Sequence, residues 1–97
     1  MKADQLAKQV FRQFQTRNIN EIAVMSGLKI IYEKWFPVTL GEFDWKKREI
    51  RVNENAKISF DKIIAHELGH YFIKIYELKI AGDEETFCDE FADNLLG

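Results

Sequence analysis

The sequence predicts an α+β fold in which residues 1–97 form one domain. A chain of 97 residues is close to the usual size of a domain and below the size at which a single core divides. Apolar residues recur at helical spacing near both ends, and short runs rich in β-branched and aromatic residues lie between residues 29 and 52. We therefore expect two N-terminal helices, a small sheet of about three strands, a long helix and a C-terminal helix.

The first predicted helix covers about residues 3–16. Apolar side chains recur there at i, i+4 spacing, at Leu6, Val10 and Phe14, while lysine, arginine and glutamine side chains fill the other side. This is the pattern of an amphipathic helix with one face against a core. We interpret this helix as part of the scaffold.

A second, shorter helix is predicted to begin after a capping residue, Asn18 or Asn20, and to end at Gly27, which suits a left-handed helix cap. Residues 22–28 also resemble the first helix and turn of a helix-turn-helix, a DNA-binding motif that needs a recognition helix after the turn. The residues that follow, 29–32, are β-branched and aromatic and favour a strand. The pattern therefore argues against a DNA-binding motif.

Three strands are predicted, at residues 29–32, 38–43 and 49–52. Pro37 suits the exit from the first of them. The third alternates apolar and polar residues, as a strand with one buried face does. Residues 44–47 are charged and aromatic and would join the second and third strands as a hairpin.

A long helix is predicted from about Phe60 to Tyr76, with Ser59 as its N-cap. Its interior contains Gly69, which is a poor helix former unless a neighbouring element packs closely against it. We expect a strand of the sheet to be that neighbour. The apolar side of the helix is expected to consist of Ile63, Ile64, Phe72 and Ile75.

This helix carries the only two histidines of the sequence, His66 and His70, in the pattern H-E-x-x-H. Side chains four apart on a helix lie about 5–6 Å from each other at Cβ, so both imidazoles can reach one ion at about 2.0–2.1 Å. Glu67 falls beside the pair without being a ligand, the position from which a carboxylate takes a proton from an activated water. The motif predicts zinc held by His66 and His70, with Glu67 as general base.

A catalytic zinc site takes three protein ligands and keeps one position open, so a further ligand must come from elsewhere in the chain. The C-terminal segment offers candidates. Acidic residues at 83–85 suit the start of a helix, and apolar residues recur at i, i+4 spacing across residues 87–95. The other face of this predicted helix carries Glu85 and Asp89.

Together the two segments resemble the gluzincin pattern, in which H-E-x-x-H is completed by E-x-x-x-D on a second helix. Here His66-Glu67-Leu68-Gly69-His70 is followed by Glu85-Thr86-Phe87-Cys88-Asp89. The resemblance implies a zincin-like fold with Glu85 as the third zinc ligand. It also implies that Asp89, one turn further on, orients a ligand histidine through its free ring N–H.

Among gluzincins, residues 64–70 and 85–96 and the strand at 50–53 most resemble the ImmA/IrrE family. Its members are typically intracellular and often accompany helix-turn-helix repressors that they help to inactivate. The resemblance implies zinc-dependent peptide-bond hydrolysis, with a protein or peptide substrate such as a helix-turn-helix repressor. That family usually continues past Leu95-Leu96 with a Met-Pro step, whereas this sequence is similar in length to the minimal soluble gluzincins. Both relationships stay open.

The other acidic residues of the C-terminal helix, and its cysteine, are expected to have structural rather than catalytic roles. Glu84, Glu90 and Asp93 are expected to lie on solvated helix faces. Glu84 is the weaker rival of Glu85 for the metal, because only Glu85 has an aspartate four residues further on. Cys88 is expected to be a buried, apolar side chain rather than a zinc ligand.

Composition limits the partners of the protein. The chain has 14 basic and 16 acidic side chains and a formal charge of −2, without the basic excess of domains that bind nucleic acid directly. No apolar run approaches the roughly 20 residues of a membrane span. We expect no membrane segment and a cytoplasmic location, with which a lone cysteine agrees.

A second function class stays open, a non-enzymatic regulatory module that binds zinc on the same scaffold and acts by contacting a regulator. An intact Glu67 favours the enzyme. A purely structural zinc site is usually closed by four protein ligands, and the pattern offers three.

Overall fold

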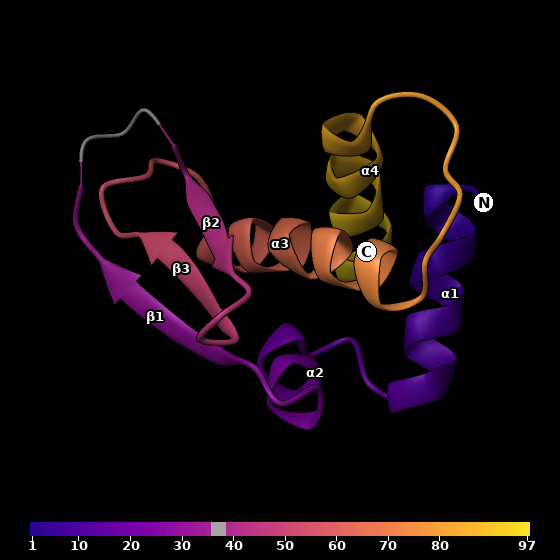
Figure 1. Ribbon diagram of the computed structural model, residues 1–97, viewed down its shortest axis with the longest axis horizontal. Helices are drawn as coiled ribbons and strands as arrows, with labels where there is room; N and C mark the ends of the chain where they lie inside the picture. Colours follow the sequence, from indigo (N-terminus) through magenta and orange to yellow (C-terminus); the bar gives the residue numbers. More distant parts are fainter. Residues whose placement is uncertain (36–38) are drawn as a thin grey trace.

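The computed structural model describes residues 1–35 and 39–97, and in them it has the predicted α+β architecture (Figure 1). In this view the sheet and the helix pair α1 and α4 lie on either side of α3. Pro37 and the predicted strand start at Val38 lie outside the described residues. The elements are α1 (Ala3–Phe14), α2 (Ile19–Met25), β1 (Lys29–Glu33), β2 (Gly41–Asp44), β3 (Glu49–Asn53), α3 (Phe60–Ile75) and α4 (Glu84–Leu96).

The N-terminal helices confirm the patterns read from the sequence. Helix α1 buries Leu6 and Val10 completely and packs against α4. Helix α2 begins after Asn18, whose side chain accepts hydrogen bonds from two main-chain N–H groups of the first turn, at 3.0 and 3.2 Å. The chain leaves α2 through Gly27, whose φ of 77° is a left-handed conformation that glycine adopts without strain.

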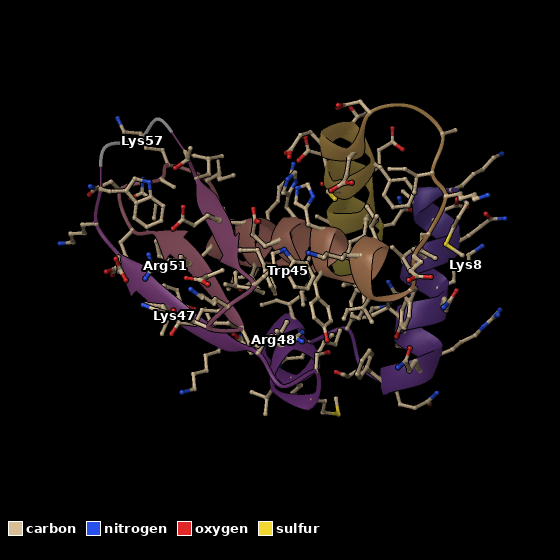
Figure 2. All side chains as sticks on the ribbon, in the orientation of Figure 1. Lys8, Trp45, Lys47, Arg48, Arg51 and Lys57 are labelled. Carbon is tan, nitrogen blue, oxygen red and sulfur yellow. The ribbon has the colours of Figure 1, made fainter. Side chains whose placement is uncertain are left out.

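The sheet has the strand order β1-β3-β2, with β1 parallel and β2 antiparallel to β3. The predicted hairpin of β2 and β3 is therefore confirmed. Ile50 and Val52 of β3 are fully buried, while Arg51 between them is only half-buried. Trp45 lies in the turn of the hairpin (Figure 2). Its ring stacks on that of Tyr71 in α3, with the ring centroids 5.7 Å apart. The hairpin is thereby packed against the helix that carries the two histidines.

Helix α3 begins as predicted at the N-cap Ser59, whose hydroxyl accepts a hydrogen bond from the N–H of Lys62 at 3.4 Å. The expected apolar side is wrong at one residue, because Ile75 is 43% exposed. The expectation assumed a single buried face. Instead the sheet and α4 both cover α3, so residues around much of the circumference of α3 are buried. Ile75 lies in the last turn of α3.

Gly69 has a different neighbour from the one expected. A Cβ atom at this position would lie 3.0 Å from Sγ of Cys88 and 3.2 Å from a ring carbon of Phe91, both in α4. The absent side chain therefore lets α4, rather than a strand, approach α3 closely. No helix in the described part of the chain is long and apolar enough to cross a membrane.

Candidate metal centre

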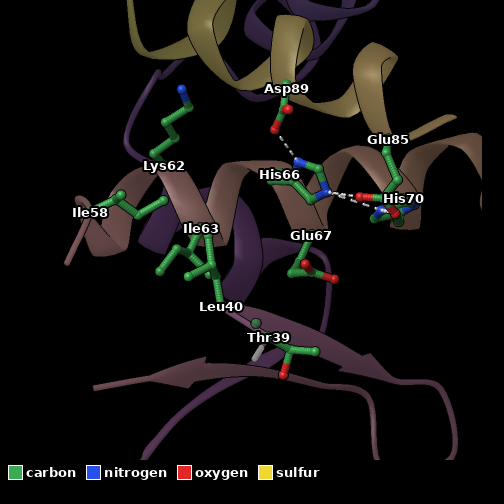
Figure 3. A pocket seen from close by; sticks show the side chains of 11 residues that line it. Thr39, Leu40, Ile58, Lys62, Ile63, His66, Glu67, His70, Glu85 and Asp89 are labelled. Atoms are coloured by element: carbon green, nitrogen blue, oxygen red, sulfur yellow. Dashed lines mark hydrogen bonds and ion pairs between the residues drawn. The ribbon is translucent and has the colours of Figure 1, made fainter. Parts of the chain in front are cut away.

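The candidate metal centre lies where the start of α4 crosses α3 (Figure 3). Helix α4 begins after Asp83, whose carboxylate accepts hydrogen bonds from the N–H and the hydroxyl of Thr86, each at 2.9 Å. These bonds lower the pKa of Asp83, because they favour its charged form. The cap places Glu84 and Glu85 in the first turn of α4, which faces the histidines of α3.

Three potential ligand atoms converge at this crossing. Nε2 of His66 lies 2.8 Å from one carboxylate oxygen of Glu85, and Nε2 of His70 lies 3.0 Å from the other. The two Nε2 atoms are 3.2 Å apart. Donor atoms held at 2.0–2.1 Å on a tetrahedral ion are about 3.3 Å from one another, so these separations fit a single ion. His66, His70 and Glu85 could together hold a metal ion.

The partners of the outer ring nitrogens favour the histidine tautomer that can bind a cation. Nδ1 of His66 lies 2.8 Å from a carboxylate oxygen of Asp89, and Nδ1 of His70 lies 2.5 Å from one of Glu84. An ionised carboxylate only accepts hydrogen bonds, so Nδ1 of a neutral imidazole donates here and Nε2 keeps its lone pair. Two lone pairs and a carboxylate then face one another, an arrangement that a shared cation stabilises.

Glu84 is the residue of this site that the sequence interpretation missed. Glu84 is exposed, as expected of a solvated helix face, but it is also the hydrogen-bond partner of His70, which the sequence interpretation did not foresee. Glu84 and Glu85 are successive residues, so they project in directions about 100° apart around α4. The adjacent Glu84 and Glu85 could have indicated this contact in the sequence, because a metal-binding histidine usually has a partner for its outer ring nitrogen.

Glu67 lies on the side of α3 that faces β2, and its side chain is buried, with 8% exposed. Burial raises its pKa, the imidazoles of His66 and His70 would oppose this rise when protonated, and the carboxylate of Glu85 adds to it. A Cβ atom on Gly41 of β2 would lie 3.6 Å from Cγ of Glu67 and 2.5 Å from Cγ2 of Ile63. Glycine at position 41 is therefore required for β2 to pass so close to α3.

A pocket of about 430 Å³ opens beside these residues (Figure 3). Its floor is α3, one wall is the start of α4, and the other is residues 39–41 at the start of β2. His66, Glu67 and His70 lie toward one end. Leu40, Ile58 and Ile63 lie toward the other end, near the side chain of Lys62, so this part of the pocket is mostly apolar with one charged residue beside it.

Other reactive side chains lie outside the centre. Cys88 is completely buried, as expected, and burial raises the pKa of its thiol, which disfavours the thiolate that binds metals. The phenol of Tyr71 donates a hydrogen bond to the carbonyl of Ser26 at 3.4 Å, and that of Tyr76 donates to Gln13 at 2.6 Å. Neither phenol is among the residues that line the pocket.

The comparison with known families agrees with the geometry. The family DUF4344, described as “Putative metallopeptidase”, matches residues 26–97, which include the sheet and both helices of the metal centre. No curated protein gives a significant match to the chain. Because the match covers well over half of the sequence, the chain belongs to this metallopeptidase family.

Proposed function

We propose that this protein is a zinc-dependent peptidase in which His66, His70 and Glu85 hold the ion and Glu67 is the general base. The observation that carries the proposal is the convergence of three acceptor atoms beside a buried carboxylate at the floor of an open pocket. Membership of a metallopeptidase family supports it.

The donor set favours zinc over harder cations. Two imidazole nitrogens and one carboxylate are typical of catalytic zinc, whereas magnesium and calcium prefer sites made of oxygen atoms. When bound, zinc would polarise the carbonyl of the scissile peptide bond and lower the pKa of water toward about 7. The remaining roles belong to side chains of the chain itself.

Glu67 is placed to move the proton. Its carboxylate lies beside the pocket and is screened from bulk water, and burial raises its pKa, so it is a better base than an exposed glutamate. We propose that it accepts the proton of the attacking water and passes it to the leaving amine. The contacts of Asp89 and Glu84 with the outer ring nitrogens would hold the two imidazole rings in the tautomer whose Nε2 is free to bind the ion.

The exposed edge of β2 supports a peptide as substrate. The carbonyl of Leu40 accepts a hydrogen bond from the N–H of Asn53 at 3.0 Å. With the register of β2 on β3, this bond shows which residues of β2 direct their main-chain groups toward β3. In an antiparallel pair every second residue faces its partner strand, so Gly41 and Phe43 direct their N–H and C=O groups away from β3. An extended peptide can pair with these groups, and Gly41 lines the pocket.

The apolar end of the pocket would then receive a side chain of this peptide. Leu40 and Ile58 are 42% and 43% exposed, and with Ile63 they form a surface on which a large apolar side chain can be buried. Such burial contributes about 1.5–3 kcal/mol for a side chain the size of leucine or phenylalanine.

From the resemblance to the ImmA/IrrE family, we further propose that the substrate is a regulatory protein, such as a helix-turn-helix repressor, and that cleavage occurs in the cytoplasm. The alternative is a regulatory module that binds zinc on this scaffold without hydrolysing peptides. The intact Glu67 favours the enzyme.

The test compares the wild-type protein with Glu67→Gln and His66→Ala on a mixed library of quenched fluorescent peptides. Glu67→Gln should keep one equivalent of zinc but lose about 10²–10⁴-fold in hydrolysis, because the amide preserves the shape without the base. His66→Ala should lose both zinc and hydrolysis. Equal background cleavage by wild type and Glu67→Gln would favour the module, and loss of zinc from Glu67→Gln would make Glu67 a ligand.

A further inference from the structure

Asn53, at the end of β3, is completely buried. Among the described residues, it and Glu67 are the polar side chains that the core buries. Burying an amide is costly unless its donor and its acceptor are both satisfied, so its partners indicate what the residue does.

The side chain of Asn53 joins three segments of the chain. Its Oδ1 accepts hydrogen bonds from the N–H of Asn55 at 2.9 Å and from that of Trp35 at 3.4 Å. Its Nδ2 donates to the carbonyl of Thr39 at 3.0 Å. One amide therefore connects the chain just after β1, the chain just before β2 and the connection that leads to α3.

Asparagine is suited to this position by its chemistry. Two N–H groups face Oδ1 and a carbonyl faces Nδ2, so the site needs an acceptor and a donor on one short side chain. Aspartate would keep the acceptor but place a carboxylate oxygen against the carbonyl of Thr39. Serine could accept from Asn55 in the local turn but is too short to reach Thr39 as well.

The segment that Asn53 holds is one wall of the pocket. Thr39 and Leu40 line it, and the next residue, Gly41, lies against Ile63 and Glu67 of α3. We call residues 39–41 the substrate wall. Asn53 holds this wall at two points, because its side-chain amide donates to the carbonyl of Thr39 and its main-chain N–H donates to the carbonyl of Leu40, each at 3.0 Å.

We propose that Asn53 is a positioning residue for substrate, which keeps the substrate wall at the separation from α3 at which a peptide binds. The inference rests on the proposed function. A positioning role can be distinguished from a general role in stability. The histidines and their carboxylate partners lie on α3 and α4 and contact one another, so they do not depend on the substrate wall. A displaced substrate wall should therefore weaken peptide binding and leave zinc affinity unchanged.

The test uses Asn53→Asp, with Asn55→Ala as its matched control. The side chain of Asn55 donates to the carbonyl of Trp35 at 2.9 Å, so the control breaks a bond in the same connection without touching Thr39. Three quantities are measured for each variant: zinc affinity by chelator competition, hydrogen exchange of the Glu42 amide in β2, and kcat and KM for the best peptide of the library. Asn53→Ser replaces Asn53→Asp if the latter does not fold.

For Asn53→Asp, KM should rise about tenfold with kcat changed far less, and the Glu42 amide should exchange about tenfold faster. Zinc affinity should stay within about twofold of wild type, and Asn55→Ala should resemble wild type in all three quantities. The proposal is overturned if both variants give the same KM and exchange rate, or if zinc affinity falls as far as KM rises. If wild-type protein cleaves no peptide, the proposed function fails, while the exchange comparison still decides whether Asn53 holds the substrate wall.

Discussion

Replacing Gly69 with alanine tests how closely α3 must approach α4. The added Cβ would lie 3.0 Å from Sγ of Cys88 and 3.2 Å from Cβ of Cys88 and from a ring carbon of Phe91. Carbon atoms in favourable contact are about 3.5–4.0 Å apart, so the two helices must separate by a few tenths of an ångström. Cys88 and Phe91 are both fully buried, so neither side chain can simply turn away.

Two effects of opposite sign decide the outcome. Alanine is about 1 kcal/mol better than glycine in a helix interior. Overpacking a core costs about 1–3 kcal/mol. We therefore expect Gly69→Ala to destabilise the protein by about 1 kcal/mol, which corresponds to a fall in Tm of about 4–8 °C for a domain of this size.

Thermal unfolding with a chelator present measures this change without the contribution of the metal. Zinc affinity should also fall, because Cys88 lies less than one turn after Glu85, and a displaced α4 carries that ligand away from His66. The control is the double variant with Cys88→Ala, which removes Sγ from the crowded contact and should show a coupling of at least about 0.5 kcal/mol. A higher Tm for Gly69→Ala, or additive effects in the double variant, would refute the reasoning.

Three further predictions concern the metal centre and the start of α4. Glu85→Ala should largely abolish zinc binding, whereas Asp89→Ala and Glu84→Ala should each weaken it about 10- to 100-fold in a chelator competition. If Glu84→Ala bound zinc as tightly as the wild-type protein, the proposed role of Glu84 in orienting His70 would be wrong. Zinc at about 1,000 times its Kd should stabilise the wild-type protein by about 4 kcal/mol in thermal unfolding, and an unchanged Tm would mean that the folded protein does not bind it. The hydrogen bonds to Asp83 lower its pKa, so its stabilising contribution is present above its ordinary value of 3.8 and is lost as pH falls through the lower, folded value. The free energy of unfolding should therefore fall less steeply at acid pH for Asp83→Asn than for the wild-type protein, and the same pH dependence in both would contradict this.

The sequence by itself determined the elements and the local part of the metal centre. The i, i+4 spacing of His66 and His70 places both side chains on one face of α3 wherever that helix lies, because helix geometry fixes it. The caps at Asn18 and Ser59 are equally local, since each side chain bonds to N–H groups within three residues. The resemblance also pointed to Glu85, which the structure brings to the two histidines, although its role as a ligand remains a prediction.

Only the tertiary structure decided which distant side chains meet. The contact of Glu84 with His70 depends on how α4 crosses α3, and the place of Gly69 against Cys88 depends on the same crossing. The bond from Asn53 to Thr39 requires β2 and β3 to pair in one register. Spacing along the chain specifies directions within one helix or strand, whereas these contacts depend on the angle and separation between two of them. Those quantities are set by packing of the whole core, in which Gly69 leaves room for α4 and Gly41 leaves room for β2.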